Sequence, residues 1–326
     1  MYKYLLYLFV CIYSSDIIMA QTPKMMYGDT DATGVPFSKD PFVLKFKGRY
    51  LIYFSIRKLA DQTNPMDGWA IGIAESNNLI NWKKIAEINP AAEYEKKGLC
   101  APGAIIKDGK VHLFYQTYGN GPKDAICHAT SDDGINFVRD ASNPVFHPTG
   151  SWTSGRAIDA EVTFFKGQYF LYFASRDPTG TIQLQGVATA PANTDFSKQY
   201  WKQACDSSIL KPMLKWEGLC VEGASVIKRG QKLYMFYAGN YNNQPQQIGL
   251  AESTDGIRWK RVSDKSFLPN GKPGEWNSSE SGHPDIFKDD DGQTYLFFQG
   301  NNDNGKTWYL SNVKIGWKDN KPYIIR

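Results

Sequence analysis

The sequence lacks the features of membrane, nucleic-acid-binding and zinc proteins. After residue 20, no apolar run approaches the roughly 20 residues that a membrane-spanning helix needs. The 37 Lys and Arg residues barely exceed the 33 Asp and Glu residues and are scattered, whereas a nucleic-acid interface needs a basic stripe. The four histidines and five cysteines form neither a CxxC nor an HxxxH spacing. We therefore expect no membrane span, no nucleic-acid partner and no zinc site.

The N-terminus has the pattern of a cleaved secretory signal peptide. Residues 1–20 begin with a basic residue, Lys3, continue with an apolar run over 4–13, and end in Ile-Met-Ala before Gln21. The apolar run is too short to anchor the chain in a bilayer. We expect a secreted or periplasmic protein whose mature chain, residues 24–326, is one domain.

Aromatic residues (14 %) and glycines (29) are plentiful, as is typical of β-rich proteins with many turns. The segment 218–240, GLCVEGASVIKRGQKLYMFYAGN, has two strand-like runs around a Lys-Arg-Gly turn, which indicates an antiparallel hairpin. The same pattern recurs about every 60 residues, in the segments 40–55, 101–117, 159–175 and 283–300. The chain is therefore a repeat of five hairpin-based units.

Each hairpin continues into a third and a fourth strand. Third strands are expected at 69–76, 125–131, 182–190 and 247–253. Fourth strands begin near Trp82, Phe137, Trp201 and Trp259. The last unit is shorter, with strands at 307–317 and 321–326. Five units of four antiparallel strands predict an all-β, five-bladed β-propeller. A β-sandwich would not place equivalent polar residues at so regular a spacing.

Two of the cysteines left after signal cleavage lie in equivalent motifs. Cys100 stands in GLCAPGA and Cys220 in GLCVEGA, so they belong to different blades. We expect small buried thiols at these positions rather than a disulfide across the axis. Cys127 and Cys205 are the other two.

Three of the hairpins carry an acidic residue at one position of the repeat. Ala101 and Pro284 stand at that position in the other two hairpins, with His283 beside the proline. A repeated position lies at one height around one axis, so the three acids should share a pocket. Like charges gathered in this way are unfavourable, which indicates a functional reason for them. The three are Asp40, Asp159 and Glu222, each eight residues before its turn glycine.

The same counting predicts different electrostatic surroundings for the three acids. Arg57 and Arg176 lie nine residues after their turn glycines, where the second strand returns to the first. We therefore expect Arg57 near Asp40, Arg176 near Asp159, and no such cation near Glu222. A neighbouring guanidinium lowers the pKa of a carboxyl group, whereas neighbouring anions raise it. This asymmetry favours Glu222 as a general acid and Asp40 as a general base.

The loops on the carboxylate face are polar and carry aromatic residues. Amide side chains pair with sugar hydroxyls, and indole rings cover sugar faces. Each Trp could equally pack within a blade. The loop candidates for substrate binding are Trp152, Trp216, Asn240 and Trp276, together with Arg57 and Arg176.

The motifs at the hairpin starts resemble those of glycoside hydrolase family 43, in family order over about residues 36–300. Asp40-Pro41 resembles its first-blade motif, Ala101-Pro102 the second, Ile158-Asp159 the third, Glu222-Gly223 the fourth and Gly282-His283 the fifth. The resemblance implies an inverting glycosidase with Asp40 as general base, Asp159 as an orienting and pKa-tuning residue, and Glu222 as general acid. It also implies that His283 lies near the axis, where some members hold a calcium ion. No cofactor is expected to be required.

The expected partner is an oligosaccharide or polysaccharide. The resemblance implies an exo-acting enzyme that removes terminal α-L-arabinofuranosyl or β-xylosyl units from plant or algal polysaccharide fragments. One alternative is a 3,6-anhydrogalactosidase acting on algal galactan oligosaccharides. Another is a carbohydrate-binding propeller without catalytic activity, although binding alone rarely needs three acids at one repeat position.

Overall fold

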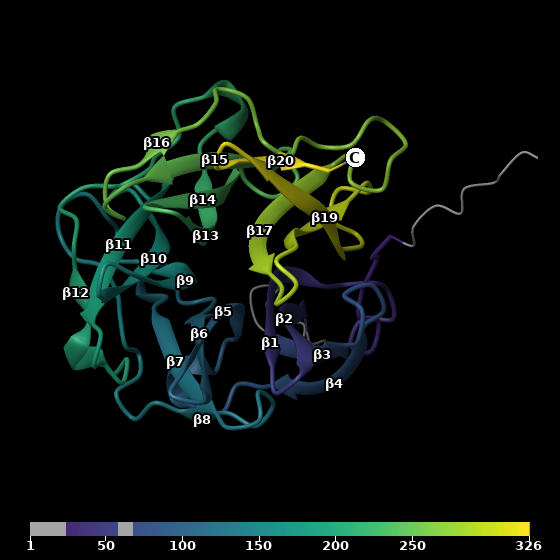
Figure 1. The fold of residues 1–326 in the computed structure, drawn as a ribbon. Helices are drawn as coiled ribbons and strands as arrows, with labels where there is room; N and C mark the ends of the chain where they lie inside the picture. The colour runs from purple at the N-terminus through teal and green to yellow at the C-terminus, as the bar shows by residue number, and fades with distance from the viewer. Residues whose placement is uncertain (1–23, 58–67, 326) are drawn as a thin grey trace, which may run out of the picture.

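The computed structural model describes residues 24–57 and 68–325. In this part of the chain, five four-stranded antiparallel sheets form a ring, and no α-helix occurs (Figure 1). The all-β five-bladed propeller predicted from the repeat is therefore confirmed. The expected signal peptide lies outside the described residues. No helix among the described residues is long and apolar enough to cross a membrane.

The strands follow one another outward from the axis in every blade. Their bounds are β1 (Lys39–Phe46), β2 (Arg49–Arg57), β3 (Trp69–Ser76) and β4 (Lys83–Ile88) in blade 1; β5 (Leu99–Lys107), β6 (Lys110–Thr117), β7 (Ile126–Ser131) and β8 (Val138–Arg139) in blade 2; β9 (Ile158–Phe165), β10 (Gln168–Arg176), β11 (Gln183–Pro191) and β12 (Lys202–Gln203) in blade 3; β13 (Val221–Arg229), β14 (Lys232–Gly239), β15 (Gln247–Ser253) and β16 (Lys260–Arg261) in blade 4; and β17 (Glu280–Lys288), β18 (Thr294–Asn301), β19 (Tyr309–Lys318) and β20 (Lys321–Ile324) in blade 5.

The hydrophobic core lies between the blades. Five clusters of buried side chains occur, one at each interface between neighbouring blades. Aromatic residues of the second strands, such as Tyr53, Phe173 and Tyr237, are fully or almost fully buried in these clusters. A blade is apolar on both faces because a neighbour covers each face, and this explains the long apolar runs that the sequence shows in its hairpins.

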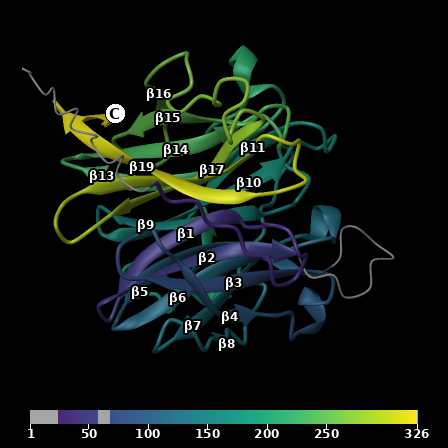
Figure 2. The same ribbon diagram turned by 90° about the vertical axis from the view of Figure 1, so that its right-hand side faces the viewer.

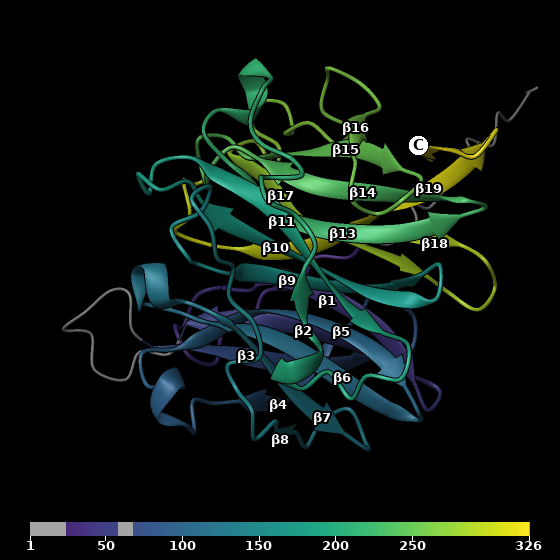
Figure 3. The ribbon, with the colours of Figure 1, turned by 90° about the vertical axis from the view of Figure 1, so that its left-hand side faces the viewer.

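The N-terminal segment joins the last blade to the first. Tyr27 pairs with Leu310 of β19, and Phe37 pairs with Trp308 just before it. The Ser311 hydroxyl donates to the carbonyl oxygen of Met25. Figure 2 views the molecule from the side of blades 1 and 5, and Figure 3 views it from the opposite side. The ring is thus held closed by the segment before β1 as well as by the contact of β1 with β17.

A buried ion pair anchors the segment that enters the first strand in blades 2 and 4. Glu217 is fully buried, accepts hydrogen bonds from the backbone amides of Met213 and Leu214, and pairs with Arg261 of β16. Glu95 and Arg139 form the same arrangement in blade 2. The buried carboxylate of Glu217 accepts several hydrogen bonds at once and so fixes the segment that leads into β13. Glu222, near the start of β13, is thereby held in the site.

Candidate active site

A β-bulge interrupts each first strand where it starts near the axis. In blade 1, for example, the pairing with β2 shifts between Lys39 and Phe42, and the other four blades show the same shift. The residue inside each bulge has a positive φ between 46° and 56°. Non-glycine residues rarely adopt this strained conformation, which is concentrated at functional sites. These bulge residues are Asp40, Ala101, Asp159, Gly223 and His283.

The bulges correct the alignment of the fourth and fifth blades. Glu222 lies one residue before its bulge, and His283, not Pro284, is the counterpart of Asp40. The count of eight residues to the turn glycine was misleading because Gly230 is the first residue of its turn, whereas Gly48 is the second. The counterpart of Arg176 in blade 4 is then Asn240 rather than Gly239, and it is likewise uncharged.

The structure nevertheless brings the three predicted acids together. Asp40, Asp159 and Glu222 all line one cavity at the start of the first strands, and each is at least nine-tenths buried. His283 and Lys39 line the same cavity. A group of carboxylates and cations at the axial end of five strands is thus present, as the repeat predicted.

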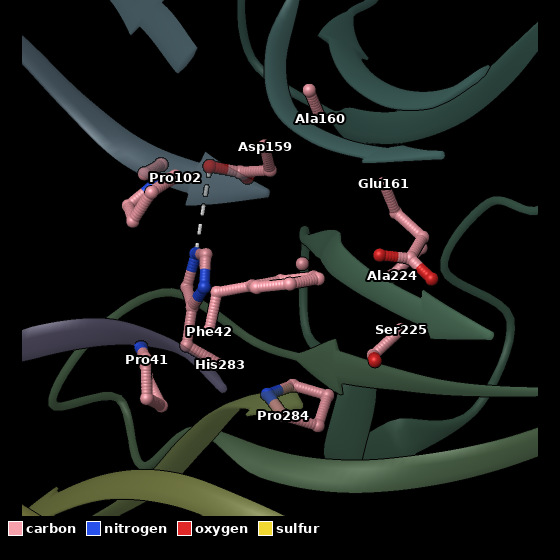
Figure 4. A pocket seen from close by; sticks show the side chains of 12 residues that line it. Pro41, Phe42, Pro102, Asp159, Ala160, Glu161, Ala224, Ser225, His283 and Pro284 are labelled. Carbon is pink, nitrogen blue, oxygen red and sulfur yellow. Dashed lines mark ion pairs between the residues drawn. The ribbon is translucent and has the colours of Figure 1, made fainter. Parts of the chain in front are cut away.

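His283 lies between two of the acids. Its Nε2 atom is 3.5 Å from an oxygen of Asp40 and 3.5 Å from an oxygen of Asp159. Figure 4 shows the imidazole ring directed toward Asp159, with Pro41, Pro102 and Pro284 around the axis. Burial alone would lower the pKa of His283, but the surrounding carboxylates raise this pKa to about 10. The imidazole is therefore positively charged at neutral pH and acts as a shared counter-ion.

Asp40 has the surroundings of a base. Burial raises the pKa of its carboxyl group, but the positive charges of His283 and Lys39 and a hydrogen bond with Ser55 outweigh this effect, so the pKa lies below its usual value. These cations replace the expected Arg57, which is paired with Trp69 at the end of β2 and does not line the cavity. The reason is again the bulge, which turns Asp40 toward the axis.

Glu222 has the surroundings of an acid. Burial and the nearby charge of Asp159 raise the pKa of its carboxyl group above the usual value. The amide of Gln246 donates to Oε1 at 2.6 Å, and the amide of Gln183 donates to Oε2. Arg176 contacts this acid only indirectly, because its Nε donates to the oxygen of Gln183. The predicted difference between the two acids is therefore present, although different residues produce it.

Asp159 has a buried carboxylate oxygen without a hydrogen-bond partner in the described part of the chain. Its backbone amide donates to Gln116 of the neighbouring blade at 2.7 Å, which fixes the bulge in place. Among the described residues no donor reaches its Oδ2 atom, although this atom is buried. Buried polar atoms usually have a partner, so this unpaired oxygen is an exception of the kind that occurs at catalytic sites.

The three loop tryptophans pack within or against the blades instead of lining this cavity. Trp152 contacts Phe173, Trp216 stacks on Tyr237, and Trp276 lies against Phe298. Each also covers a glycine of its blade, where a Cβ atom would lie within about 3 Å of the indole ring. Their positions before the first strand therefore serve packing, which was the alternative that the sequence left open. Asn240 hydrogen-bonds within its own loop, to Gln244 and Tyr241.

Sequence comparison decides the family. The model named Glycosyl hydrolases family 43 matches residues 34–322, nearly the whole chain. The chain belongs to glycoside hydrolase family 43.

Three solved structures illustrate how widely this fold is shared. A thermostable family-43 glycoside hydrolase is 21% identical, with a TM-score of 0.70, 92% of this chain covered and 96% of the other. An α-L-arabinofuranosidase from Lactobacillus brevis is 16% identical, with a TM-score of 0.68 and coverages of 87% and 93%. An exo-1,5-α-L-arabinanase from a bovine ruminal metagenomic library is also 16% identical, with a TM-score of 0.65 and coverages of 91% and 99%.

The axial histidine of this family 43 enzyme does not fit a calcium site. In the described part of the chain, no three His, Cys, Asp or Glu side chains are arranged to hold a metal ion. The ring of His283 is held as an imidazolium by Asp40 and Asp159. A positively charged ring has no free lone pair for a metal and repels one. The chemistry of the donors thus disagrees with the expected ion.

Several residues of this glycosidase site were not predicted. Their signals in the sequence are weak, because each is a polar or aromatic residue near a strand end and such residues usually face solvent. A closer signal was the proline at positions 41, 102 and 284, which marks the residue after the bulge in three blades and identifies His283 as the counterpart of Asp40. The unpredicted cavity residues include Lys39, Trp69, Tyr118, Arg156, Gln183 and Tyr241.

All four cysteines of the described residues are free thiols, in agreement with the expectation of no axial disulfide. Cys100 and Cys220 are almost fully buried beside the site. Burial raises the pKa of both thiols well above the usual value. Neither residue therefore has a reactive thiolate, and Cys100 contributes to the cavity lining as a small side chain.

Proposed function

We propose that this family 43 enzyme is an inverting exo-glycosidase that removes terminal α-L-arabinofuranosyl or β-xylosyl units from plant or algal polysaccharide fragments. The observation that carries the proposal is the opposite displacement of two pKa values in one cavity: Asp40 is displaced downward and Glu222 upward. A glycosidase separates its general acid from its second carboxylate by such a difference in pKa, and the resemblance to family 43 motifs supports inversion.

In the proposed reaction, ionised Asp40 removes a proton from a water molecule as that water attacks the anomeric carbon. Protonated Glu222 donates its proton to the oxygen of the leaving sugar. Asp159 accepts a hydrogen bond from a hydroxyl of the bound sugar, and the positive charge of His283 lowers the pKa of Asp40. After one turnover Asp40 holds a proton and Glu222 holds none, so proton exchange with solvent restores the enzyme.

Burial of the carboxyl groups supports exo action. Asp40, Asp159 and Glu222 are each less than one-tenth exposed, so a sugar must enter the cavity to reach all three. A terminal residue enters more easily than a unit inside a chain. Two structural neighbours, an arabinofuranosidase and an exo-arabinanase, support the choice of terminal sugar. The proposed place of action is outside the cytoplasm, on the basis of the signal-like residues 1–20.

A panel of aryl glycosides and oligosaccharides tests the proposal, and it should include terminal 3,6-anhydrogalactose. We expect release of arabinose or xylose from chain ends, with inversion visible by NMR at early times. Glu222→Gln should spare aryl substrates with good leaving groups more than natural glycosides, because a good leaving group needs little protonation. Asp40→Asn should depress both. Retained configuration would exclude the roles assigned here, and equal losses for both substrate types would refute Glu222 as the acid.

A further inference from the structure

A second hollow continues from the catalytic cavity toward the outside of blades 2 and 3. Tyr118, Arg156 and Arg176 line both spaces and so form the junction between them. The walls of the outer hollow come from the loop after β6 and from residues 178–180 after β10. These loops connect the second and third strands of their blades on the face that carries the carboxylates, where the sequence predicted substrate contacts.

The outer hollow lies on the acid side of the site. Arg176 donates to Gln183, and Gln183 donates to Glu222, so one side chain separates the guanidinium from the proposed acid. The acid must stand beside the oxygen of the leaving sugar. In the proposed reaction, the outer hollow is therefore the place for the leaving sugar and the axial cavity the place for the terminal sugar.

One of the two arginines at this junction, Arg176, has no carboxylate partner among the described residues. The hydrogen bonds of Arg176 go to neutral oxygens, those of Gln183 and Gly180, and its guanidinium lies over the ring of Tyr241. Within the described residues, no carboxylate lies at ion-pair distance from Arg176. Arg156 is different, because it pairs with Asp124 at 3.3 Å; Asp124 is almost fully buried and also lines the outer hollow. The remaining carboxylates of the cavity are the three at the axis.

We infer that the leaving sugar carries an anionic group, a uronate carboxylate or a sulfate ester, which Arg176 binds with the help of Arg156. A guanidinium presents donors in a fork that matches the oxygens of both groups. Its position over an aromatic ring orients the fork and lowers the entropy lost on binding. A neutral sugar would leave Arg176 partly buried without an anion. The inference rests on the proposed function, because it assigns the outer hollow to that reaction.

The test compares four substrates that share one terminal sugar. The leaving sugar is a neutral hexose, its uronic acid, the methyl ester of that uronic acid, or a sulfated hexose. We expect the wild-type kcat/KM for a charged substrate to exceed that for the neutral ones by about ten- to a hundredfold, as for other hydrogen bonds to charged groups. The uronate and sulfate arms identify which anion fits, and added salt should reduce the preference.

Arg176→Gln should reduce this preference to nearly one, and Arg156→Gln should reduce it in part. Arg258→Gln is the control, because it also removes one positive charge but from a side chain that is 91% exposed on blade 4. Equal wild-type rates on the uronate and its methyl ester, with the sulfate no better, would overturn the inference and leave the proposed function standing. So would an Arg176→Gln loss that is equal for charged and neutral substrates, because Arg176 would then act only by positioning Gln183.

If the enzyme cleaves none of the four, the proposed function fails, and calorimetry decides the inference separately. Binding of the uronate or the sulfated disaccharide, but not of the methyl ester, that weakens in Arg176→Gln would support an anion site. Equal binding of all four compounds, or no binding, would refute it.

Discussion

Replacing His283 by asparagine should separate the electrostatic role of this residue from its backbone role. His283 has a φ of 46°, and asparagine is among the few residues that adopt this conformation readily. The substitution therefore keeps the bulge and removes the positive charge between Asp40 and Asp159. Both carboxylates lose their nearest cation, which lies 3.5 Å from each.

The size and sign of the effect follow from the pKa of His283. A pKa of about 10 in the folded protein, against about 6.5 in an unfolded chain, corresponds to about 5 kcal/mol in favour of the charged form. Breaking a buried charge pair by removing one partner costs a similar amount, about 3–5 kcal/mol. Because the folded pKa is the higher one, this stabilisation is complete below about pH 6.5 and is lost as the pH rises toward 10.

Urea denaturation of both proteins between pH 6 and pH 10.5 measures the difference in the free energy of unfolding. We expect His283→Asn to be less stable by about 3–5 kcal/mol at the acidic end and nearly equal to wild type at the alkaline end. The acidic limb of the kcat/KM profile should also move to higher pH, because the pKa of Asp40 rises without its neighbour. A stability difference that is constant over this range would show that His283 is uncharged and would refute the electrostatic argument.

Three further predictions concern packing and binding. Arg261→Met should lower the free energy of unfolding by about 3–5 kcal/mol in denaturant titrations, because it leaves Glu217 charged and buried; a loss below about 1 kcal/mol would contradict a buried pair. Gly103→Ala should destabilise by more than about 2 kcal/mol, because its Cβ would lie 2.0 Å from a backbone oxygen of blade 3; wild-type melting would disprove this contact. Trp69 lines the cavity, so Trp69→Ala should raise KM, whereas Trp216 packs in the core, so Trp216→Ala should lower stability by about 3–5 kcal/mol and leave KM unchanged. The reverse pattern would show that Trp216, and not Trp69, binds the sugar.

The fold could be predicted from the sequence because the repeat is strong at every level. Aromatic second strands and polar turns before the fourth strands recur in register, and turn glycines recur to within one residue. The observed third strands begin within about two residues of the expected positions. Closure of the ring could not be predicted, because the pairing of Tyr27 and Phe37 with the last blade involves no repeated pattern. A single isolated contact between chain ends has no periodic signal in sequence.

The acids of the site could be predicted, and so could two of its cations, His283 and Arg176, but Lys39 and Arg156 could not. Counting from the turn glycine assumed turns of identical form, and Gly230 occupies a different place in its turn, which shifted Glu222 by one residue. Counting also treated the first strands as regular, so it placed Arg57 beside Asp40 and missed Lys39. A bulge reverses the direction of the side chains that follow it, and no residue type is required at one. The counting error therefore affected the predicted neighbours of each acid, but not the prediction that the acids gather at the start of the first strands.

The charges of the site explain how three acids can share one cavity. With Glu222 protonated, the remaining charges at the axis are those of Asp40 and Asp159, and they are matched by His283 and Lys39. His283 stands on the fifth bulge, at the same repeat position as the two aspartates that it neutralises. The symmetry that gathers the negative charges thus also places their counter-ion. This balance requires Glu222 to hold its proton. Removing the positive charge of His283 should therefore raise the pKa of Glu222 as well as that of Asp40. The residue that the fifth blade contributes thus acts on both catalytic carboxyl groups.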